Sequence, residues 1–378
     1  MLEQLDRPAG NLVDILSGEY GIVSFDNSTK VLQIITDPFL TKPVFIGRGH
    51  DPSEIGVASY ASALHQLGFT AIHCAQPNTF YRINFAATSL QISERFPVFN
   101  YTLNQQEKNY DRWTEAFVEA VRRRATHGAH EPLVCLSSGY DSGGIALALN
   151  LLNIPYRTIS ILAGEQEKIL RQRVQINALY CKESMQIPGI TKSEQERIRS
   201  AINTVVEPLP YSHFDNAGQV TRLSDDGGAI GLYAIAEHAS GLGTRVSLSG
   251  SGADEIMSDY GNKGLKLAEH SEFGGLFPAR LEGFFPWKKF YGDTQRSYLF
   301  KEEYILGSQG MEGRYPYLDR DLVQEFLSLD PALKNKEYKA PLTHFLRTHN
   351  YPFEPETKRG FSAGLPSRWK RFRRLFKS

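Results

Sequence analysis

The sequence predicts an α/β fold in which a parallel sheet with flanking helices is preceded by a small β-rich domain. The first observation is that strand-like and helix-like segments alternate from about residue 106, as in LVCL, GGIALALNLL, YRTISILA and AIGLYAIAEHA. Such alternation is typical of parallel sheets covered by helices. The second observation is that residues 16–100 contain mainly short strand-like runs separated by turn residues. We therefore expect one domain over residues 1–105 and a second over 106–378.

Local patterns justify the individual elements. YGIVSF and VLQIITD flank DNSTK, whose Asn and Ser suit a tight turn between two strands. We expect a helix at SYASALHQLG and strands at FTAIHC and TFYRINF. In the second domain, Phe117, Val118 and Val121 recur at helical spacing and predict a first helix. From about Phe284 the chain is predicted to be mostly helical.

Composition, charge and cysteine content narrow the function classes. The 378 residues are 41% hydrophobic, which is ample for buried cores. Because 42 Lys and Arg balance 42 Asp and Glu, no global field attracts nucleic acid or an anionic membrane. Cys74, Cys135 and Cys181 have no paired metal-ligand spacing, and their odd number argues against a secreted disulfide framework. With no signal segment and no apolar run of about 20 residues, we expect a soluble cytoplasmic protein without nucleic-acid or membrane partners.

The stretch LVCLSSGYDSGGIALAL, residues 133–149, predicts a strand, a Ser/Gly-rich turn and a helix that begins near Ser142 or Gly143. Free N–H groups and the positive end of the helix make such a turn suitable for phosphate. A glycine-rich turn without a ligand is the alternative. Asp141 would repel phosphate unless a divalent cation lay between them, which favours magnesium.

A second turn of the same kind follows RVSL, in LSGSGADEIMSDY at residues 248–260. It carries Asp254 and Glu255. If both strands belong to one parallel sheet, their turns meet at the edge where ligands of open α/β sheets bind. We therefore expect one site built from both turns.

These motifs carry a resemblance to a known family. SSGYDS looks like the SGGxDS loop of the ATP pyrophosphatases, and LSGSGADEIMSDY is similar to the asparagine synthetase motif LSGEGSDELFGGY. MEGRYPYLDRDLV (311–323) and KRGFSAGLPSRW (358–369) match the same family in the same order. The resemblance implies a synthetase domain that adenylates a carboxylate with Mg-ATP, releases pyrophosphate and passes the acyl group to an amine.

The resemblance also implies residue roles. The pyrophosphate loop would comprise Ser137, Ser138, Gly139, Tyr140, Asp141 and Ser142. Asp141 and Asp254 would be the magnesium ligands. Backbone around Leu136, Ile161, Ser249 and Gly250 would hold the nucleotide.

Two lysines complete the expected site. Lys358 occupies the family lysine before Gly-Phe and would stabilise charge at the α-phosphate and during amide formation. Lys339, in EYKAPLTHFLR, resembles a second lysine that faces pyrophosphate, although a solvated helix lysine is an equal alternative. Glu312 and Arg314 are expected to form an internal ion pair, and Asp319 is expected to cap the following helix.

The chain departs from the family pattern at two positions of the site. Ser138 replaces the second glycine of the loop. Ser251 stands where asparagine synthetases carry Glu and β-lactam synthetases carry Tyr, a position that helps to handle the incoming amine in both families. The change at Ser251 favours a different substrate or a different base, and Tyr260 is a nearby candidate.

GEYGIVSFD and TDPFLTKPVFIG resemble the glutamine-hydrolysing domain of the same family. There a cysteine directly after the initiator Met attacks glutamine, whereas here Leu2 follows Met1 and the earlier glutamine-binding segments are missing. Cys74 lies inside a strand-like run and has no free amine beside it. We expect a truncated domain without glutaminase activity, which favours a homodimer or a partner protein.

The leading hypothesis is an AMP-forming, glutamine-independent amide ligase that joins a small-molecule or peptide carboxylate to ammonia or an amine, as in the biosynthesis of a specialised metabolite. One alternative is an asparagine synthetase-like enzyme that receives ammonia from a partner subunit. Another is a non-catalytic nucleotide-binding or regulatory homologue.

Overall fold

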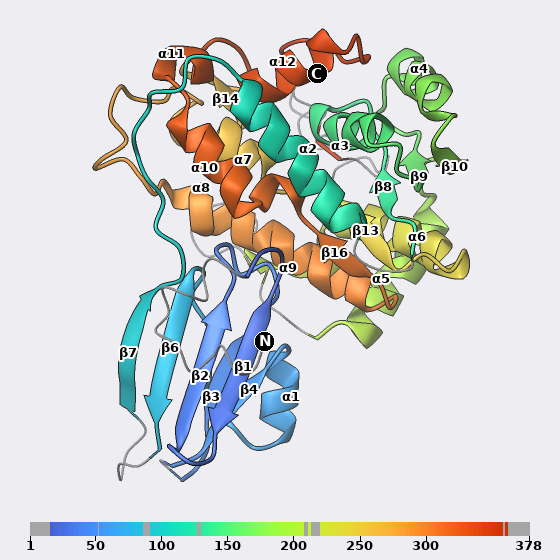
Figure 1. Cartoon of the computed structure of the whole chain (residues 1–378). Coiled ribbons are helices and arrows are strands. Elements are labelled where there is room, and N and C mark those ends of the chain that lie inside the picture. Colours follow the sequence, from blue (N-terminus) through green and yellow to red (C-terminus); the bar gives the residue numbers. More distant parts are fainter. Residues whose placement is uncertain are drawn as a thin grey trace, which may run out of the picture.

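The computed structural model describes residues 16–51, 53–85, 91–126, 130–207, 211–212, 220–357 and 360–361. Its two parts are visible in Figure 1, where a β-rich N-terminal region lies below a larger α/β region. The predicted fold class is confirmed. The boundary between residues 105 and 106 stays a prediction.

The larger region is built on a five-stranded parallel sheet. In sheet order its strands are β10 (Cys181–Ile187), β9 (Tyr156–Ile161), β8 (Leu133–Cys135), β13 (Val246–Leu248) and β16 (Glu312–Arg314). The chain adds β9 and β10 on one side of β8, and β13 and β16 on the other. The order therefore reverses between β8 and β13, and in open α/β sheets ligands bind at this point.

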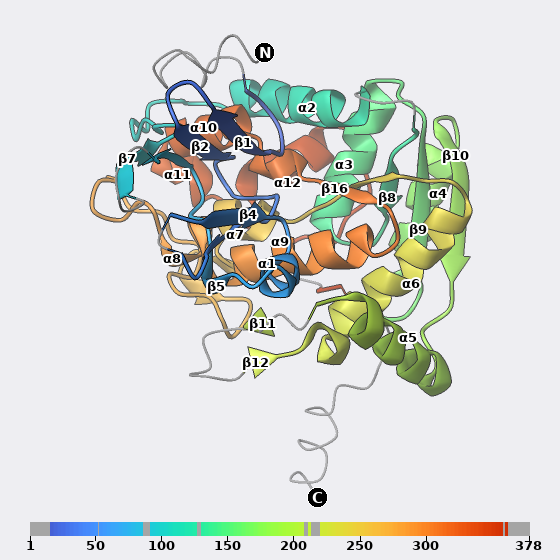
Figure 2. The same ribbon diagram turned by 90° about the horizontal axis from the view of Figure 1, so that it is seen from below.

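Two layers of helices cover the sheet, as Figure 2 shows from below. On one face lie α2 (Asp111–Thr126), α3 (Tyr140–Leu151), α4 (Glu167–Asn177), α10 (Arg320–Ser328) and α12 (Ala340–Thr348). On the other lie α5 (Lys192–Val205), α6 (Gly227–Gly241) and α9 (Asp293–Gly307). Side chains of β8 alternate between the layers, because Val134 joins the core of the first face and Leu133 that of the second.

Shorter elements connect these layers. They are α7 (Ala253–Met257), α8 (Lys288–Tyr291), α11 (Pro331–Lys334), the 3₁₀ turns Leu223–Asp225 and Pro316–Leu318, and two short hairpins, β11 (Tyr211–Ser212) with β12 (Val220–Thr221) and β14 (Gly261–Asn262) with β15 (Leu265–Lys266).

The N-terminal region consists of two antiparallel sheets. The first has the order β1 (Gly21–Asp26), β2 (Val31–Thr36), β6 (Thr79–Asn84), β7 (Gln91–Pro97), and the second the order β4 (Ile55–Ala58), β3 (Phe45–Arg48), β5 (Thr70–Cys74). Their inner faces share an apolar core that includes Ile34, Ile46 and Tyr81. Helix α1 (Ala61–Gln66) packs beside β4 and β5.

Polar contacts join the N-terminal region to α9 and its surroundings. Lys42 donates from Nζ to both carboxylate oxygens of Glu303 at 2.9 Å and to the carbonyl of Gly313 at 2.8 Å. The Glu207 carboxylate accepts from the backbone N–H of Ser62 at the start of α1 and from the hydroxyl of Tyr304. The β-rich region is thus fixed against helix α9.

Most predicted elements are present, and the differences lie in short or polar segments. The predicted turn at DNSTK joins β1 and β2. The polar strand β10 and the three-residue strand β16 were not predicted, because their sequences lack a buried apolar run and their conformation depends on pairing with β9 and β13.

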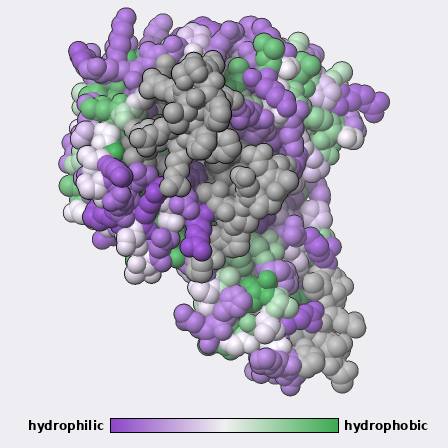
Figure 3. Space-filling model, turned by 180° about the vertical axis from the view of Figure 1, so that it is seen from behind, coloured by the Kyte–Doolittle hydropathy of each residue, from purple (hydrophilic) through white to green (hydrophobic). Residues whose placement is uncertain are grey.

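The described part of the rear face in Figure 3 is mainly hydrophilic, with apolar residues interspersed. In the described ranges, no helix combines the length and the apolar character that a membrane crossing requires.

Candidate active site

The loops after β8 and β13 meet at the point where the strand order reverses. The two strands pair in parallel, with Leu248 opposite Val134. A Cβ added at Gly250 would lie 2.7 Å from the Cβ of Asp141, so the loops are in direct contact. Leu136 and Ile161, at the ends of β8 and β9, border the same edge. The structure thus brings together the predicted loop residues and the predicted nucleotide-contacting backbone.

Helix α3 begins at Tyr140, earlier than the predicted start near Ser142 or Gly143. The Tyr140 hydroxyl lies between the carbonyl of Glu354 at 3.0 Å and the N–H of Glu356 at 2.8 Å, which fixes the first turn against the C-terminal segment. Asp141 consequently occupies the first turn, where a negative charge interacts favourably with the helix dipole.

Internal hydrogen bonds shape the loop. The hydroxyls of Ser137 and Ser142 are 2.9 Å apart, and the N–H of Gly139 donates to Ser137 Oγ at 3.1 Å. Ser138 donates from both its N–H and its hydroxyl to Oε2 of Glu165, each at 2.5 Å. In this structure, therefore, a carboxylate takes the donors that the sequence assigned to pyrophosphate at Ser138. The hydroxyl of Ser138, at the position of the family glycine, is paired with Glu165, an acid that no sequence motif marks.

A buried arginine lies beneath the loop. Nη1 of Arg173 donates to the carbonyls of Ser137 and Gly139, at 2.5 and 2.7 Å, and Nε donates to the carbonyl of Pro352 at 2.9 Å. A Cβ at Gly143 would lie 2.5 Å from the guanidinium, which explains the glycine there. By turning the loop carbonyls inward, Arg173 leaves the opposite side of the backbone to face a ligand.

Lys339 joins the two predicted magnesium ligands. Its Nζ lies 2.5 Å from Oδ1 of Asp141 and 3.0 Å from Oδ1 of Asp254, and the hydroxyl of Tyr338 also donates to Asp254. Burial lowers the pKa of Lys339, but the two carboxylates outweigh burial and raise it above its usual value. Lys339 is buried, so the solvated helix lysine is not what the structure shows.

The side chain at the altered family position contacts a different acid. Ser251 donates from Oγ to Oε1 of Glu302 in α9, at 2.7 Å. Tyr260, the candidate base from the sequence, is buried and donates its hydroxyl to Glu255. Burial and the Glu255 charge raise the pKa of Tyr260 well above its usual value, which keeps the phenol protonated at neutral pH and makes it a poor base.

The remaining predicted residues are accounted for as follows. Lys358 lies outside the described residues. The ion pair of Arg314 with Glu312 is confirmed at 3.1 Å. Asp319 is confirmed as the N-cap of α10, accepting from the N–H groups of Asp321 and Leu322.

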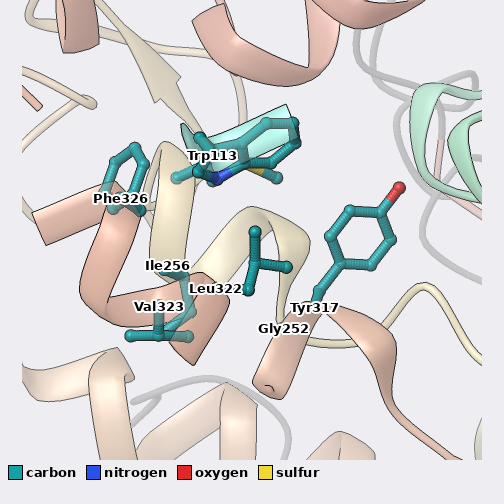
Figure 4. A pocket seen from close by; sticks show the side chains of 8 residues that line it. Trp113, Gly252, Ile256, Tyr317, Leu322, Val323 and Phe326 are labelled. Atoms are coloured by element: carbon teal, nitrogen blue, oxygen red, sulfur yellow. The ribbon is translucent and has the colours of Figure 1, made fainter. Parts of the chain in front are cut away.

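A small apolar gap of about 10 Å³ lies beside the loop after β13. Its lining residues, most of which are labelled in Figure 4, are Trp113, Gly252, Ile256, Met257, Tyr317, Leu322, Val323 and Phe326. The hydroxyl of Tyr317 donates to the carbonyl of Asp141, so this residue belongs to both the gap and the loop. The gap is too small and too apolar for a nucleotide, and it is part of the core that supports the loop.

Gly252→Ala is expected to lower the free energy of unfolding by more than about 1 kcal/mol. Gly252 has a φ of +96°, and an added Cβ would lie 2.4 Å from Leu318. Gly241→Ala is the control, because no atom lies within 4 Å of its added Cβ and alanine favours the helix. Denaturant unfolding of both variants measures the difference. Equal stability of the two variants would contradict the strain assigned to Gly252.

The functional residues missed by sequence reasoning are Glu165, Arg173 and Glu302. Each lies far along the chain from the loop residue that it contacts and belongs to no recognisable motif. The unusual Ser138 and Ser251 were the available signals, since each marks the position where one of these acids binds.

Comparison with known proteins shows what this chain is similar to. Residues 112–295 match the family model described as asparagine synthase. The chain is 22% identical over 357 residues to a protein of Methanocaldococcus jannaschii named putative asparagine synthetase [glutamine-hydrolyzing] 1, and 24% identical over 350 residues to a mimivirus protein named probable asparagine synthetase [glutamine-hydrolyzing]. Each match covers 85% of this chain and 58% of the relative. Residues 112–295 therefore form an asparagine synthase-like region, in agreement with the names of both relatives.

Proposed function

We propose that this protein is an ATP-dependent carbon–nitrogen ligase that activates a carboxylate as its acyl-adenylate and transfers the acyl group to ammonia or an amine. The observation that carries the proposal is the cluster of Asp141, Asp254 and Lys339 where the loops after β8 and β13 meet. Its position, at the reversal of strand order, is where open α/β sheets bind ligands.

The residues present fit Mg-ATP. Asp141 and Asp254 both lie within ion-pair distance of Lys339, and carboxylate oxygens are ligands that magnesium prefers. Among the described residues no group of three or more His, Cys, Asp or Glu gathers as a metal site. Two carboxylates are the usual protein contribution when phosphate oxygens and water complete the magnesium shell. Bound magnesium would neutralise phosphate charge, and Lys339 would face the departing pyrophosphate.

We further propose that this chain does not obtain nitrogen by hydrolysing glutamine. Cys74 is the one cysteine before residue 105. Its thiol lies 3.3 Å from Arg296, and burial raises its pKa, so it lacks the character of a nucleophile. Ammonia or an amine would then reach the acyl-adenylate directly or from a partner. Among the described strands β1 lies at the edge of its sheet, and its exposed apolar side chains Val23 and Phe25 support an associated partner or second copy.

Exchange of labelled pyrophosphate into ATP tests the proposed function. The protein is incubated with Mg-ATP and a panel of carboxylic acids that starts with aspartate, because the named relatives are asparagine synthetases. We expect exchange that depends on one class of acid. Ser251 favours an acid other than aspartate, as in the biosynthesis of a specialised metabolite. If no acid supports exchange and calorimetry detects no binding of Mg-ATP, the non-catalytic alternative replaces this proposal.

A further inference from the structure

Glu302 differs from the other acids at this edge of the sheet. Oε1 accepts from the hydroxyl of Ser251 at 2.7 Å, whereas Oε2 is a buried oxygen without a hydrogen-bond partner among the described residues. A buried carboxylate oxygen without a donor is costly unless it serves another purpose. We therefore expect Oε2 to accept a hydrogen bond or a proton from a ligand.

The other carboxylates of the site are engaged. Asp141 and Asp254 bind Lys339, Glu165 binds Ser138, and Glu255 accepts from Tyr260. Each of these acids is already neutralised or committed to holding a loop. Among the described acids of this site, Glu302 keeps an oxygen available for a proton donor that enters the site.

Three consecutive residues of α9 have different partners. Lys301 lies 3.8 Å from Asp226, and Glu303 binds Lys42 of the N-terminal region. Glu302, between them, is directed to the loop after β13, whose Gly250 contacts Asp141. The helix is thus held on both sides while it presents one carboxylate to the site.

The surroundings of Glu302 tune its protonation. Burial raises the pKa of Glu302, and hydrogen bonds from Ser249 and Ser251 and the charges of Lys301 and Lys42 oppose that rise. The other titratable neighbours are Glu303, whose charge disfavours a second anion, and the neutral side chains of Cys135 and Tyr315. Burial raises the pKa of Cys135 to about 12, and that of Tyr315 also rises well above its usual value, so neither competes for the proton at neutral pH.

We propose that Glu302 is the general base that removes a proton from the incoming ammonium ion or protonated primary amine, with the Ser251 hydroxyl holding its carboxylate beside the loop. The inference rests on the proposed function, because it assigns the second half of that reaction. One N–H bond breaks and its proton passes to Oε2. The freed electron pair forms the C–N bond, the acyl C–O bond breaks, and AMP leaves with the electrons of that bond. The second proton of an ammonium passes to solvent as the amide forms.

The test separates the two half-reactions with an acid that supports exchange. Glu302→Gln keeps the hydrogen bond to Ser251 and loses the basic carboxylate. We expect pyrophosphate exchange within about twofold of the wild type and a loss of at least about a hundredfold in amide formation from ammonium chloride, the range of a general base. Hydroxylamine is largely unprotonated at neutral pH, so the hydroxamate yield should fall much less. The rise of amide formation with pH that reports ionisation of Glu302 should also disappear.

Glu303→Gln is the matched control on the next residue. It loses the ion pair with Lys42 and is expected to be less stable, but the ratio of amide formation to exchange should stay far closer to the wild-type value than in Glu302→Gln, because Glu302 keeps its carboxylate and its hydrogen bond to Ser251. If the wild type catalyses pyrophosphate exchange and Glu302→Gln forms the amide from ammonia at the wild-type rate, this inference alone is overturned. If Glu302→Gln loses both pyrophosphate exchange and amide synthesis, Glu302 acts in the first step, and this inference is overturned as well. Absence of exchange in the wild type would overturn the proposed function and this inference together.

Discussion

Asp141→Asn is expected to reduce substrate-dependent pyrophosphate exchange by at least about a hundredfold, because charge compensation on transferring phosphates contributes several kcal/mol to such reactions. The variant keeps the shape of the side chain and removes its charge. The fold should survive, since Asp254 still pairs with Lys339 at 3.0 Å and the carbonyl of residue 141 still accepts from Tyr317. Exchange at several magnesium concentrations measures the effect, and thermal unfolding checks the fold.

Glu337→Gln is the control for this change. Glu337 precedes Lys339 by two residues, but its carboxylate binds Arg347, whose side chain is half exposed. Exchange by this variant should match that of the wild type, because an exposed ion pair contributes at most about 1 kcal/mol to stability. Normal exchange by Asp141→Asn would remove Asp141 from the cation site and leave its pairing with Lys339 as a structural contact.

The two loops could be predicted from sequence because each is a contiguous motif after a short apolar strand. Turn residues are present within both motifs, 137–142 and 249–254. Parallel pairing of β8 with β13 then places the two turns at the same edge of the sheet. Lys339 was ambiguous, since its local sequence fits a surface helix equally well. Its burial depends on Asp141 and Asp254, which lie far away along the chain.

Contacts that depend on the packing of distant helices could not be predicted. Glu302 follows Ser251 by 51 residues and Glu165 follows Ser138 by 27, and neither acid has a local pattern that distinguishes it from a solvated helix or loop residue. Helix α3 begins earlier than expected from the sequence for a related reason. Tyr140 is held by the segment at Glu354 and Glu356, and that distant contact fixes where the helix begins.

The chemistry of the proposed site therefore depends on residues that shape the loops as well as on those that face a substrate. Arg173 is the clearest case. Among the described residues, no hydrogen bond joins its guanidinium to Asp141 or Lys339. The guanidinium does donate to two carbonyls of the loop that precedes Asp141. Replacing Arg173 should therefore affect nucleotide affinity more than the rate of any chemical step.

Arg173→Met is expected to weaken Mg-ATP binding by at least about tenfold and to lower the unfolding temperature. Methionine fills much of the volume but leaves the partly buried carbonyls of Ser137, Gly139 and Pro352 without their donor, and a buried unsatisfied group costs about 1–3 kcal/mol, which is the upper limit for each. Arg173→Lys should recover only part of the loss, because an ammonium cannot reproduce the guanidinium fork. Calorimetric titration with Mg-ATP and thermal unfolding measure the two effects.

Arg171→Met is the matched control, two residues away on α4. Arg171 pairs with Glu167, and both side chains are largely exposed, so its loss should change neither ATP affinity nor stability measurably. Gly143→Ala approaches the same interaction from the loop: its Cβ would displace the guanidinium while leaving Arg173 in the sequence. It should therefore reproduce the binding defect of Arg173→Met. Wild-type ATP affinity in a folded Arg173→Met protein would show that the loop keeps its shape without the arginine, and that the helix α3 terminus alone positions the N–H groups.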